Sequence, residues 1–383
     1  MDIRALTLDD YEPTRAVLAQ AFGAITDADW ERSVRGARPL LETGRLFGAY
    51  EDGRLVATAR LHDMGQWWHG RRVSMGGVGG VAVVPEARGR GLGRALMTEV
   101  LRRCADFGHA VSMLYPATTP LYRSLGWEHA GSRDEVELRT EFLRVARAET
   151  AVPVRRAGPD DAAEVAATLR RIHEAAGDCG AVDRSEESWR PALDDRGFHY
   201  LAEDGFLSYG WDEGNTALVV ARLVGASAAT VRALWAVVGS GSSTAETVRA
   251  IVAPHDPVLW TLRERESERL TRTRWMLRVV DAPAAIEARG YPAGVTAEVP
   301  LEVEDPQVPA NAGSWTLVVK DGEGRLERSA GHAGAVRLGP RGLAALYSGV
   351  PVATLRRAGL LAGGDTGALG AAFAAEPYAL DFF

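Results

Sequence analysis

The sequence predicts an α/β protein in which two successive domains, each with a mixed central sheet flanked by helices, precede a smaller α+β domain. Residues 76–127 read as a strand, a glycine-rich turn, a helix and a second strand. Residues 3–10 are echoed by residues 154–161, which indicates an internal duplication. A third group of strands and helices begins near residue 275. Two or three domains also suit a chain of 383 residues.

The first elements are a short strand at residues 3–6 and a helix at residues 10–22. The Asp-Gly pair at residues 52 and 53 predicts a hairpin between the two strands that flank it, at 45–50 and 55–61. Residues 66–70 are expected to interrupt the regular strands before the central strand begins.

The central strand and the helix after it are the clearest elements. Residues 78–84 are small and β-branched, as a buried strand requires, and Pro85 ends the strand. The helix has apolar residues three or four positions apart, which share one face: Leu92, Leu96, Val100, Cys104 and Phe107. Gly108 suits the position after the helix, and residues 110–114 read as the next strand.

The turn before this helix has the chemistry of a phosphate or pyrophosphate site. The first backbone N–H groups of a helix have no partner inside it, and the macrodipole adds partial positive charge there. Glycine allows a ligand to approach the backbone closely, and arginine adds formal charge. The turn contains both: Arg88, Gly89, Arg90, Gly91, Leu92, Gly93 and Arg94. The alternative is a tight turn with exposed arginines.

Two other phosphate-binding motifs are excluded. A P-loop ends in Gly-Lys-Ser/Thr, whereas Lys320 is the only lysine of the chain and is followed by Asp321. A dinucleotide-binding fingerprint needs glycine or alanine at its sixth position, and a motif that starts at Gly89 has Arg94 there.

The turn instead fits the pattern Arg/Gln-x-x-Gly-x-Gly/Ala, and it resembles the pyrophosphate loop of the GNAT family of N-acetyltransferases. The segment Thr119–Trp127 resembles the family segment whose tyrosine faces the thioester sulfur. The resemblance implies acetyl-CoA as co-substrate. Beside the turn itself, it implies these further residues in cofactor binding: Val81, Ala82, Val83, Ala117 and Thr118.

Tyr122 is the implied general acid, because a phenol within hydrogen-bond reach can protonate the thiolate that acyl transfer expels. A half-buried structural tyrosine is the alternative. No covalent nucleophile is needed, and the chain shows no Cys/His signature for one.

The remaining elements were predicted from local patterns. In the second copy, residues 228–238 read as a helix that the Gly/Ser run 239–243 ends. This copy lacks the Arg-x-x-Gly-x-Gly pattern and is not expected to bind coenzyme A. In the third group, residues 295–303 and 313–320 read as strands and residues 321–324 as a hairpin turn. Residues 340–347 and 365–373 read as helices.

Composition and charge narrow the function. Hydrophobic residues are 46% and charged residues 25% of the chain, as in ordinary globular proteins. No apolar run reaches the roughly 18 residues of a membrane span, and the first residues do not resemble a signal peptide. Cys104 and Cys179 do not make a disulfide framework, so we expect a cytoplasmic protein. The net charge of −7 argues against nucleic acid as the binding partner and is compatible with cationic amines as substrates. The eight histidines show no metal-binding spacing.

The whole layout resembles the enhanced-intracellular-survival (Eis) acetyltransferases, which have a GNAT domain, a degenerate second one, and a domain similar to sterol carrier proteins. Matching segments in the last part are 275–291, 346–349 and 371–374. The resemblance implies domains at residues 1–148, 149–278 and 279–383, and a closed homo-oligomer such as a hexamer.

The resemblance also implies a mechanism and an acceptor. The C-terminal carboxylate, here that of Phe383, is the implied general base, and the acceptor is a primary amine on an aminoglycoside, a polyamine or a lysine. A last strand that is merely packed on a core is the alternative for the terminus. Gly80 stands where the family often has an aromatic pocket residue, and Phe382 replaces a frequent acid.

Asp27 and Trp30 are candidates to line an amine pocket, since acids and an aromatic ring both attract cations. A solvated loop that leads into a helix is their alternative. For the whole chain, two other functions remain open: a lipid-binding module, because of the last domain, and an acyl-CoA sensor without turnover.

Overall fold

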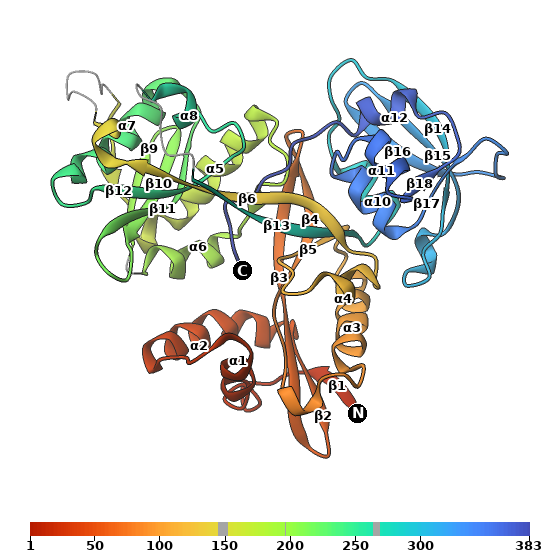
Figure 1. The fold of residues 1–383 in the computed structure, drawn as a ribbon, viewed down its shortest axis with the longest axis horizontal. Coiled ribbons are helices and arrows are strands. Elements are labelled where there is room, and N and C mark those ends of the chain that lie inside the picture. Colours follow the sequence, from red (N-terminus) through yellow and green to blue (C-terminus); the bar gives the residue numbers. More distant parts are fainter. Residues whose placement is uncertain (145–151, 196, 263–268) are drawn as a thin grey trace.

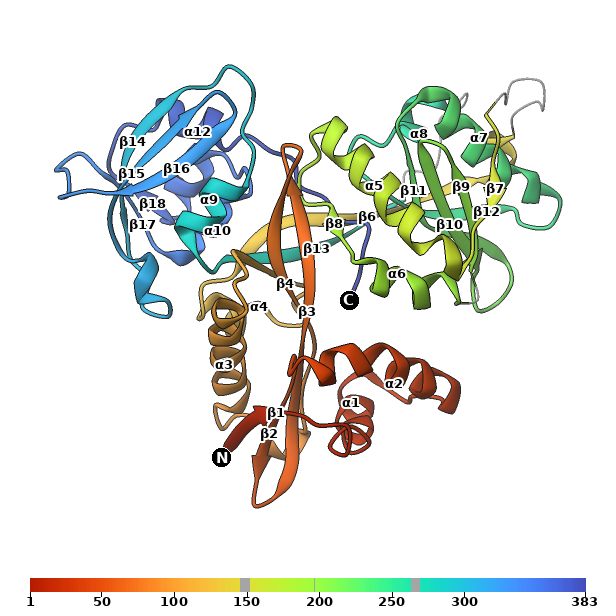
Figure 2. The ribbon, with the colours of Figure 1, turned by 180° about the vertical axis from the view of Figure 1, so that it is seen from behind.

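The computed structural model describes residues 1–144, 152–195, 197–262 and 269–383. A mixed sheet of thirteen strands runs through the first two domains, and a separate sheet of five strands forms the third. Figure 1 shows the three parts as lobes around two long crossing strand pairs, and Figure 2 shows the same lobes from behind. No helix among the described residues is long and apolar enough to cross a membrane.

The first part of the large sheet carries the predicted site. Its strands are β1 (Asp2–Ala5), β2 (Leu46–Glu51), β3 (Arg54–Trp68), β4 (Arg71–Val83) and β5 (Val111–Leu114). Helices α1 (Thr14–Phe22) and α2 (Asp27–Glu42) lie on one side of β3 and β4, and α3 (Leu92–Asp106) lies on the other (Figure 1).

The predicted hairpin at Asp52 and Gly53 is confirmed: both residues have positive φ, 48° and 76°, as a tight two-residue turn requires. The predicted interruption at residues 66–70 is wrong. β3 continues through Trp68, because His69 and Gly70, with φ of 47° and 75°, make the turn into β4.

Strand exchange joins the first two domains. β6 (Glu128–Arg139) follows the first domain in sequence but pairs with β12 (Thr247–Val252) of the second. In return, β13 (Leu270–Val279) lies between β5 and β6. A third group of elements was expected to begin near residue 275; residues 275–279 instead lie in β13, within the large sheet. The boundary predicted at 148/149 lies outside the described residues.

The rest of the large sheet belongs to the second domain. Its strands are β7 (Arg155–Arg156), β8 (Val182–Asp183), β9 (Phe198–Ala202), β10 (Gly205–Trp211) and β11 (Ala217–Gly225). Its helices are α5 (Ala162–Ala176), α6 (Glu186–Leu193), α7 (Ala228–Gly239) and α8 (Val258–Thr261). β8 reaches across to pair with β3 of the first domain.

The sequence echo corresponds to equivalent structure. Arg4 lies in β1 and Arg155 begins β7, and these two strands are at opposite ends of the strand order. Arg4 donates to Asp10 at 2.8 Å, and Arg155 donates to Asp161 at 2.8 Å. In each copy the aspartate also accepts from the backbone N–H three residues before it, at 2.9 and 2.8 Å. These shared contacts support the duplication.

The third domain packs helices on its own sheet. The strands are β14 (Ala297–Val303), β15 (Gly313–Lys320), β16 (Glu323–Arg328), β17 (Val336–Leu338) and β18 (Leu361–Ala362). The helices are α9 (Ala282–Ala288), α10 (Pro340–Tyr347), α11 (Val352–Arg357) and α12 (Gly367–Ala372). One apolar core runs from Trp68 and Trp275 into this domain. Arg278 and Asp305, 2.7 Å apart and fully buried, form an ion pair across the junction.

Candidate active site

The centre of the candidate site is the place where β4 and β5 separate. The two strands pair in parallel from Met75 to Val78, opposite Val111 to Leu114. β5 then ends, whereas β4 continues through Val83. Among the described residues, no strand pairs with this last part of β4 on the β5 side. On this side, the backbone of Val81, Ala82 and Val83 therefore has no partner strand and can accept an extended ligand.

A β-bulge marks the same part of β4. Thr58 pairs with Ala82 and Arg60 pairs with Gly79, so Gly80 and Val81 together oppose one residue of β3. Gly80 has a φ of 58°, and its carbonyl accepts from the Thr58 hydroxyl at 3.1 Å. A Cβ atom on Gly80 would lie 3.2 Å from the Arg60 side chain. Gly80 therefore turns β4 and leaves room for Arg60.

The glycine-rich turn forms an open helix start. Gly91 is the N-cap of α3, with a φ of 82°, and its position has no side chain to cap the helix. A Cβ atom on either Gly89 or Gly91 would meet no atom within 4 Å. No side chain caps the first N–H groups of α3, and the turn beside them leaves space, as a pyrophosphate site requires.

The arginines of the turn are held by neighbouring segments. Arg88 donates to the Val83 carbonyl at 3.0 Å, and Arg90 donates to Glu51 at 2.6 Å. Arg94 donates to the hydroxyl of Ser124 at 2.6 Å. Because Ser124 follows the short helix that contains Tyr122, this last contact links the turn to the predicted general acid.

In the second domain, a side chain caps the start of the equivalent helix. α7 begins after Ser227, whose hydroxyl accepts from the backbone N–H of Thr230 at 3.1 Å. A serine cap satisfies an N–H group that would otherwise be free for a phosphate. This difference supports the prediction that the second domain does not bind coenzyme A.

Tyr122 lies on α4 (Thr119–Arg123), in the apolar cluster that also contains Val78 and Ala82 of β4. Its ring meets Trp127 edge to face, with centroids 6.5 Å apart. Burial raises the pKa of Tyr122 to about 12, so the hydroxyl keeps its proton at neutral pH. Ala117 and Thr118 lie exposed in the loop between β5 and α4.

The C-terminal segment runs between the domains to β4. Backbone N–H groups of Tyr378 and Ala379 donate to Cys179 and Ser132, both at 3.0 Å. The Tyr115 hydroxyl then donates to the backbone carbonyl of Asp381 at 2.6 Å. Figure 1 shows the C-terminus near the middle of the molecule, between the second lobe and the helices α1 and α2 of the first.

Asp381 anchors the end of this segment. Its buried carboxylate forms ion pairs with Arg184 at 3.1 Å and with Arg222 at 2.5 Å. Burial alone raises the pKa of Asp381, but the two guanidinium charges outweigh burial and lower it. The carboxylate is therefore charged at neutral pH and holds the last two residues in one place.

Phe383 lies against β4 at two glycines. A Cβ atom on Gly77 would lie 2.9 Å from the Phe383 ring, and one on Gly79 would lie 3.0 Å from the carboxyl carbon. Gly77 and Gly79 share one face of β4, because side chains alternate along a strand. The terminal carboxyl group therefore lies beside the bulge where the two strands separate.

A cavity of about 540 Å³ opens at Phe383. Its charged lining is mostly basic and comes from α2, the turn before β2, β3, β4 and the second domain: Arg35, Arg45, Arg60, Arg72, Arg170 and Arg184. The acids of the lining are Asp63, Glu187 and the C-terminal carboxyl group of Phe383. His62 also lines it, and burial, with the charges of Arg60 and Arg184, lowers the pKa of His62 to about 4. This lining is opposite in charge to the one expected for a cationic amine.

Asp27 and Trp30 lie outside this lining. The Asp27 side chain is 91% exposed and pairs with Arg15 at 2.6 Å. Trp30 is buried, stacks on Tyr11 and donates to Glu12 at 2.8 Å. Later turns of the same helix reach the cavity instead, through Arg35, Pro39 and Leu40 among others.

Sequence reasoning missed Arg60, His62, Tyr115 and Arg184. One signal could have pointed to this place: the run Gly76-Gly77-Val78-Gly79-Gly80 inside a central strand. Glycine weakens a strand and often marks the close approach of another chain segment. Here that segment is the C-terminus.

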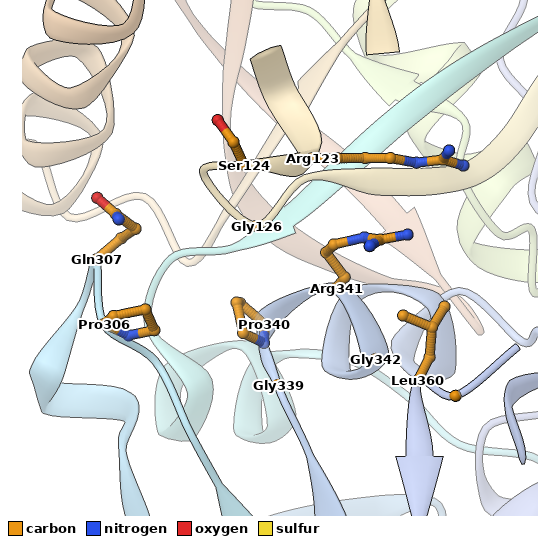
Figure 3. Close-up of a pocket in the computed structure, with 11 residues that line it drawn as sticks. Arg123, Ser124, Gly126, Pro306, Gln307, Gly339, Pro340, Arg341, Gly342 and Leu360 are labelled. Carbon is orange, nitrogen blue, oxygen red and sulfur yellow. The ribbon is translucent and has the colours of Figure 1, made fainter. Parts of the chain in front are cut away.

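A second, smaller cavity of about 200 Å³ lies between α4 and the third domain (Figure 3). Its two arginines, Arg123 and Arg341, both pair with the buried Glu128, at 2.8 and 2.6 Å. These contacts tie the third domain to the segment that holds Tyr122.

Among the described residues, no group of three or more His, Cys, Asp or Glu side chains could hold a metal ion.

Family models agree with this architecture. Acetyltransferase (GNAT) domain models match residues 2–130 and 180–279, and a sterol carrier protein domain model matches residues 282–380. N-acetyltransferase Eis of Mycobacterium tuberculosis is 30% identical over an alignment of 281 residues, and the match covers 65% of this chain. The match spans 64% of that relative's length, slightly less than two thirds. An uncharacterized N-acetyltransferase of Streptomyces avermitilis is 26% identical over 94% of this chain and 92% of its own.

Solved structures show the same fold over the whole chain. A GCN5-related N-acetyltransferase from Kribbella flavida has a TM-score of 0.95 and 45% identity, covering 100% of this chain and 98% of its own. Eis1 from Mycobacterium abscessus has a TM-score of 0.78 at 24% identity, with both chains fully covered.

Two GNAT units followed by a sterol carrier domain define the class of this protein as an acetyltransferase of the GNAT superfamily. Within that class, the chain is similar in sequence to N-acetyltransferase Eis over 65% of its length and shares the fold of Eis1. The fold class predicted from the sequence is confirmed.

Proposed function

We propose that the chain transfers the acetyl group of acetyl-CoA to a primary amine. The observation that carries the proposal is the convergence on β4 of three separate parts: the open start of α3, the Tyr122 segment and the C-terminal carboxyl group. Each part suits one requirement of acyl transfer, namely an anion site, an acid and a base.

In this proposal, the pyrophosphate binds to the N–H groups of residues 89–94, and the pantetheine arm pairs with Val81, Ala82 and Val83. The amine nitrogen attacks the thioester carbonyl carbon, and the Phe383 carboxylate accepts a proton from that nitrogen. The carbon–sulfur bond breaks, and Tyr122 donates its hydroxyl proton to the departing thiolate. The products are an N-acetylated amine and free coenzyme A.

Release of coenzyme A with a panel of amines tests this function. The panel contains an aminoglycoside, a polyamine and lysine, and we expect turnover with at least one primary amine. Tight coenzyme A binding without turnover on any amine would instead favour an acyl-CoA sensor. Co-purified lipid without affinity for coenzyme A would favour a lipid-binding module.

We also propose a closed homo-oligomer, on the strength of the family resemblance and because a fixed terminus suits a rigid assembly. Light scattering at assay concentrations is expected to give a mass several times that of one chain. A mass of one chain, 41.1 kDa, would reject this assembly.

A further inference from the structure

We propose that the amine acceptor carries an acidic group, a carboxylate or a phosphate, and that Arg60 and Arg35 bind it. This inference rests on the proposed acetyl transfer and narrows its substrate class from amines in general to acid-bearing amines such as amino acids. The evidence is the charge of the cavity that opens at Phe383.

Most of the lining arginines already have carboxylate partners. Arg72 and Arg170 share Asp183, with contacts of 2.5 and 2.8 Å. Arg45 pairs with Asp63 at 3.3 Å. Arg184, as described above, pairs with Asp381. These contacts stabilise the walls and leave little charge for a ligand.

Arg60 is different. Its guanidinium group donates to two hydroxyl oxygens, of Tyr11 at 3.0 Å and of Ser33 at 3.1 Å. Within the described part of the chain, no carboxylate pairs with Arg60 or with Arg35. Two uncharged hydroxyls orient the Arg60 group without neutralising it, so its charge remains available to a ligand.

Arg60 also lies close to the proposed base. Its side chain would contact a Cβ atom on Gly80, and the Phe383 carboxyl group would contact one on Gly79, the adjacent residue. His62 lies close to both groups. The centroid of its ring is 5.9 Å from that of the Phe383 ring, and the charge of Arg60 contributes to lowering the pKa of His62. When the amine of an acceptor faces the terminal carboxylate, a second group a few atoms from that amine would therefore lie within reach of Arg60.

The physical consequence is selectivity. Arginines in a partly enclosed cavity repel a polycation, because the local dielectric constant is lower than in water. They attract a carboxylate or phosphate, with which arginine forms strong charge-assisted hydrogen bonds. The same positive field lowers the pKa of a bound ammonium group and so favours the free amine that attacks the thioester. A volume of about 540 Å³ suits a small molecule.

Matched pairs of amines test the proposal, since the members of each pair differ by one carboxylate. The pairs are tyrosine with tyramine and lysine with cadaverine, assayed by coenzyme A release. We expect kcat/KM to be about tenfold or more higher for the acid-bearing member, with the difference shrinking at high salt. Equal values, or a preference for tyramine and cadaverine, would overturn the proposal.

Two variants and one control locate the effect. Arg60→Gln and Arg35→Gln are each expected to reduce the preference within a pair, mainly by raising KM for the acid-bearing member. Arg32→Gln is the control, because Arg32 lies on the same helix but outside the cavity lining. Arg35 is exposed, so its variant reports on binding even if the Arg60 variant is unstable. An unchanged preference in the Arg35 variant and in a folded Arg60 variant would reject these residues as the binding groups.

Calorimetry separates this proposal from the proposed function. Binding of tyrosine and of tyramine is measured with the protein saturated with coenzyme A, so no turnover is needed. Tighter binding of tyrosine supports an acid-binding cavity even if the turnover assay fails. Equal binding with normal turnover rejects the cavity assignment and leaves acetyl transfer standing.

Discussion

At the scale of single residues, glycines decide where other groups can approach the backbone. Gly77 and Gly79 make room for Phe383 on β4, and Gly80 forms the bulge beside Arg60. Gly91 leaves the start of α3 open, with a φ that side-chain-bearing residues rarely adopt. A larger side chain would collide with Phe383 at Gly77 and Gly79, and with Arg60 at Gly80.

Gly91→Asp is expected to abolish acetyl-CoA binding, because it places a carboxylate at the proposed pyrophosphate site. Gly108→Asp at the opposite end of α3 is the matched control: its φ is 74°, and a Cβ atom there also meets open space. Both variants carry the same charge and similar backbone strain, about 1–2 kcal/mol. Calorimetry with acetyl-CoA compares them, and equal affinities would contradict the assignment of the turn.

Tyr122→Phe is expected to lower kcat by roughly 10²–10⁴-fold, the usual contribution of general acid catalysis, with acetyl-CoA affinity kept. Because burial raises the Tyr122 pKa to about 12, ionisation of this hydroxyl is expected to cause no loss of activity between pH 7 and about pH 11. Tyr50→Phe is the control, since Tyr50 bonds to Asp10 instead. A normal kcat in the Tyr122 variant would leave protonation of the thiolate to water.

At the scale of elements, two similar units have diverged through their helix starts. α3 begins at an uncapped glycine, whereas α7 begins at a serine that caps it. The C-terminal segment is the other decisive element, because Tyr115 holds it to the first domain and Asp381 holds it to Arg184 and Arg222 of the second. A segment fixed in this way can present its own carboxylate with precision.

One glycine added after Phe383 moves the terminal carboxylate by about 3.5 Å and keeps every side chain. We expect turnover to fall sharply while acetyl-CoA affinity is retained. Steady-state kinetics and calorimetry on the extended protein measure the two quantities. Full activity would assign the base to water or to another group; Asp381 is already occupied by two arginines, and Glu376 pairs with His255 at 2.8 Å.

At the scale of the whole molecule, the three domains depend on one another. In the large sheet, β13 pairs with β5 of the first domain and β6 pairs with β12 of the second, so neither domain's part of the sheet is built from one continuous stretch of chain. The C-terminus of the third domain then returns to the first. The cavity at Phe383 consequently has walls from all three parts of the chain.

A fragment of residues 1–148 is expected not to fold as a stable monomer. Without β13, β5 loses the partner that pairs Leu114 with Met276, and it becomes an exposed apolar edge. Circular dichroism and light scattering on the purified fragment measure folding and aggregation. A soluble fragment with a cooperative thermal transition would show that the first domain is independent of the exchanged strand.

The sequence by itself determined the local features. The turn at 88–94, the helix after it and the hairpin at Asp52 and Gly53 were predictable, because contiguous residues set backbone conformation and helix-end chemistry. The family resemblance added the order of domains and pointed to Tyr122 and to the terminal carboxyl group of Phe383.

Only the tertiary structure decided the rest. It placed β13 beside β5 in the large sheet. It left Asp27 and Trp30 outside the lining of the cavity at Phe383, and it brought arginines from residue 35 to residue 184 together around that cavity. Strand exchange and charge clustering depend on which distant segments meet, and the energy of a charge depends on its neighbours and on the solvent around it. No local pattern in the sequence contains that information, so the polarity of the acceptor cavity emerged only when the chain was folded.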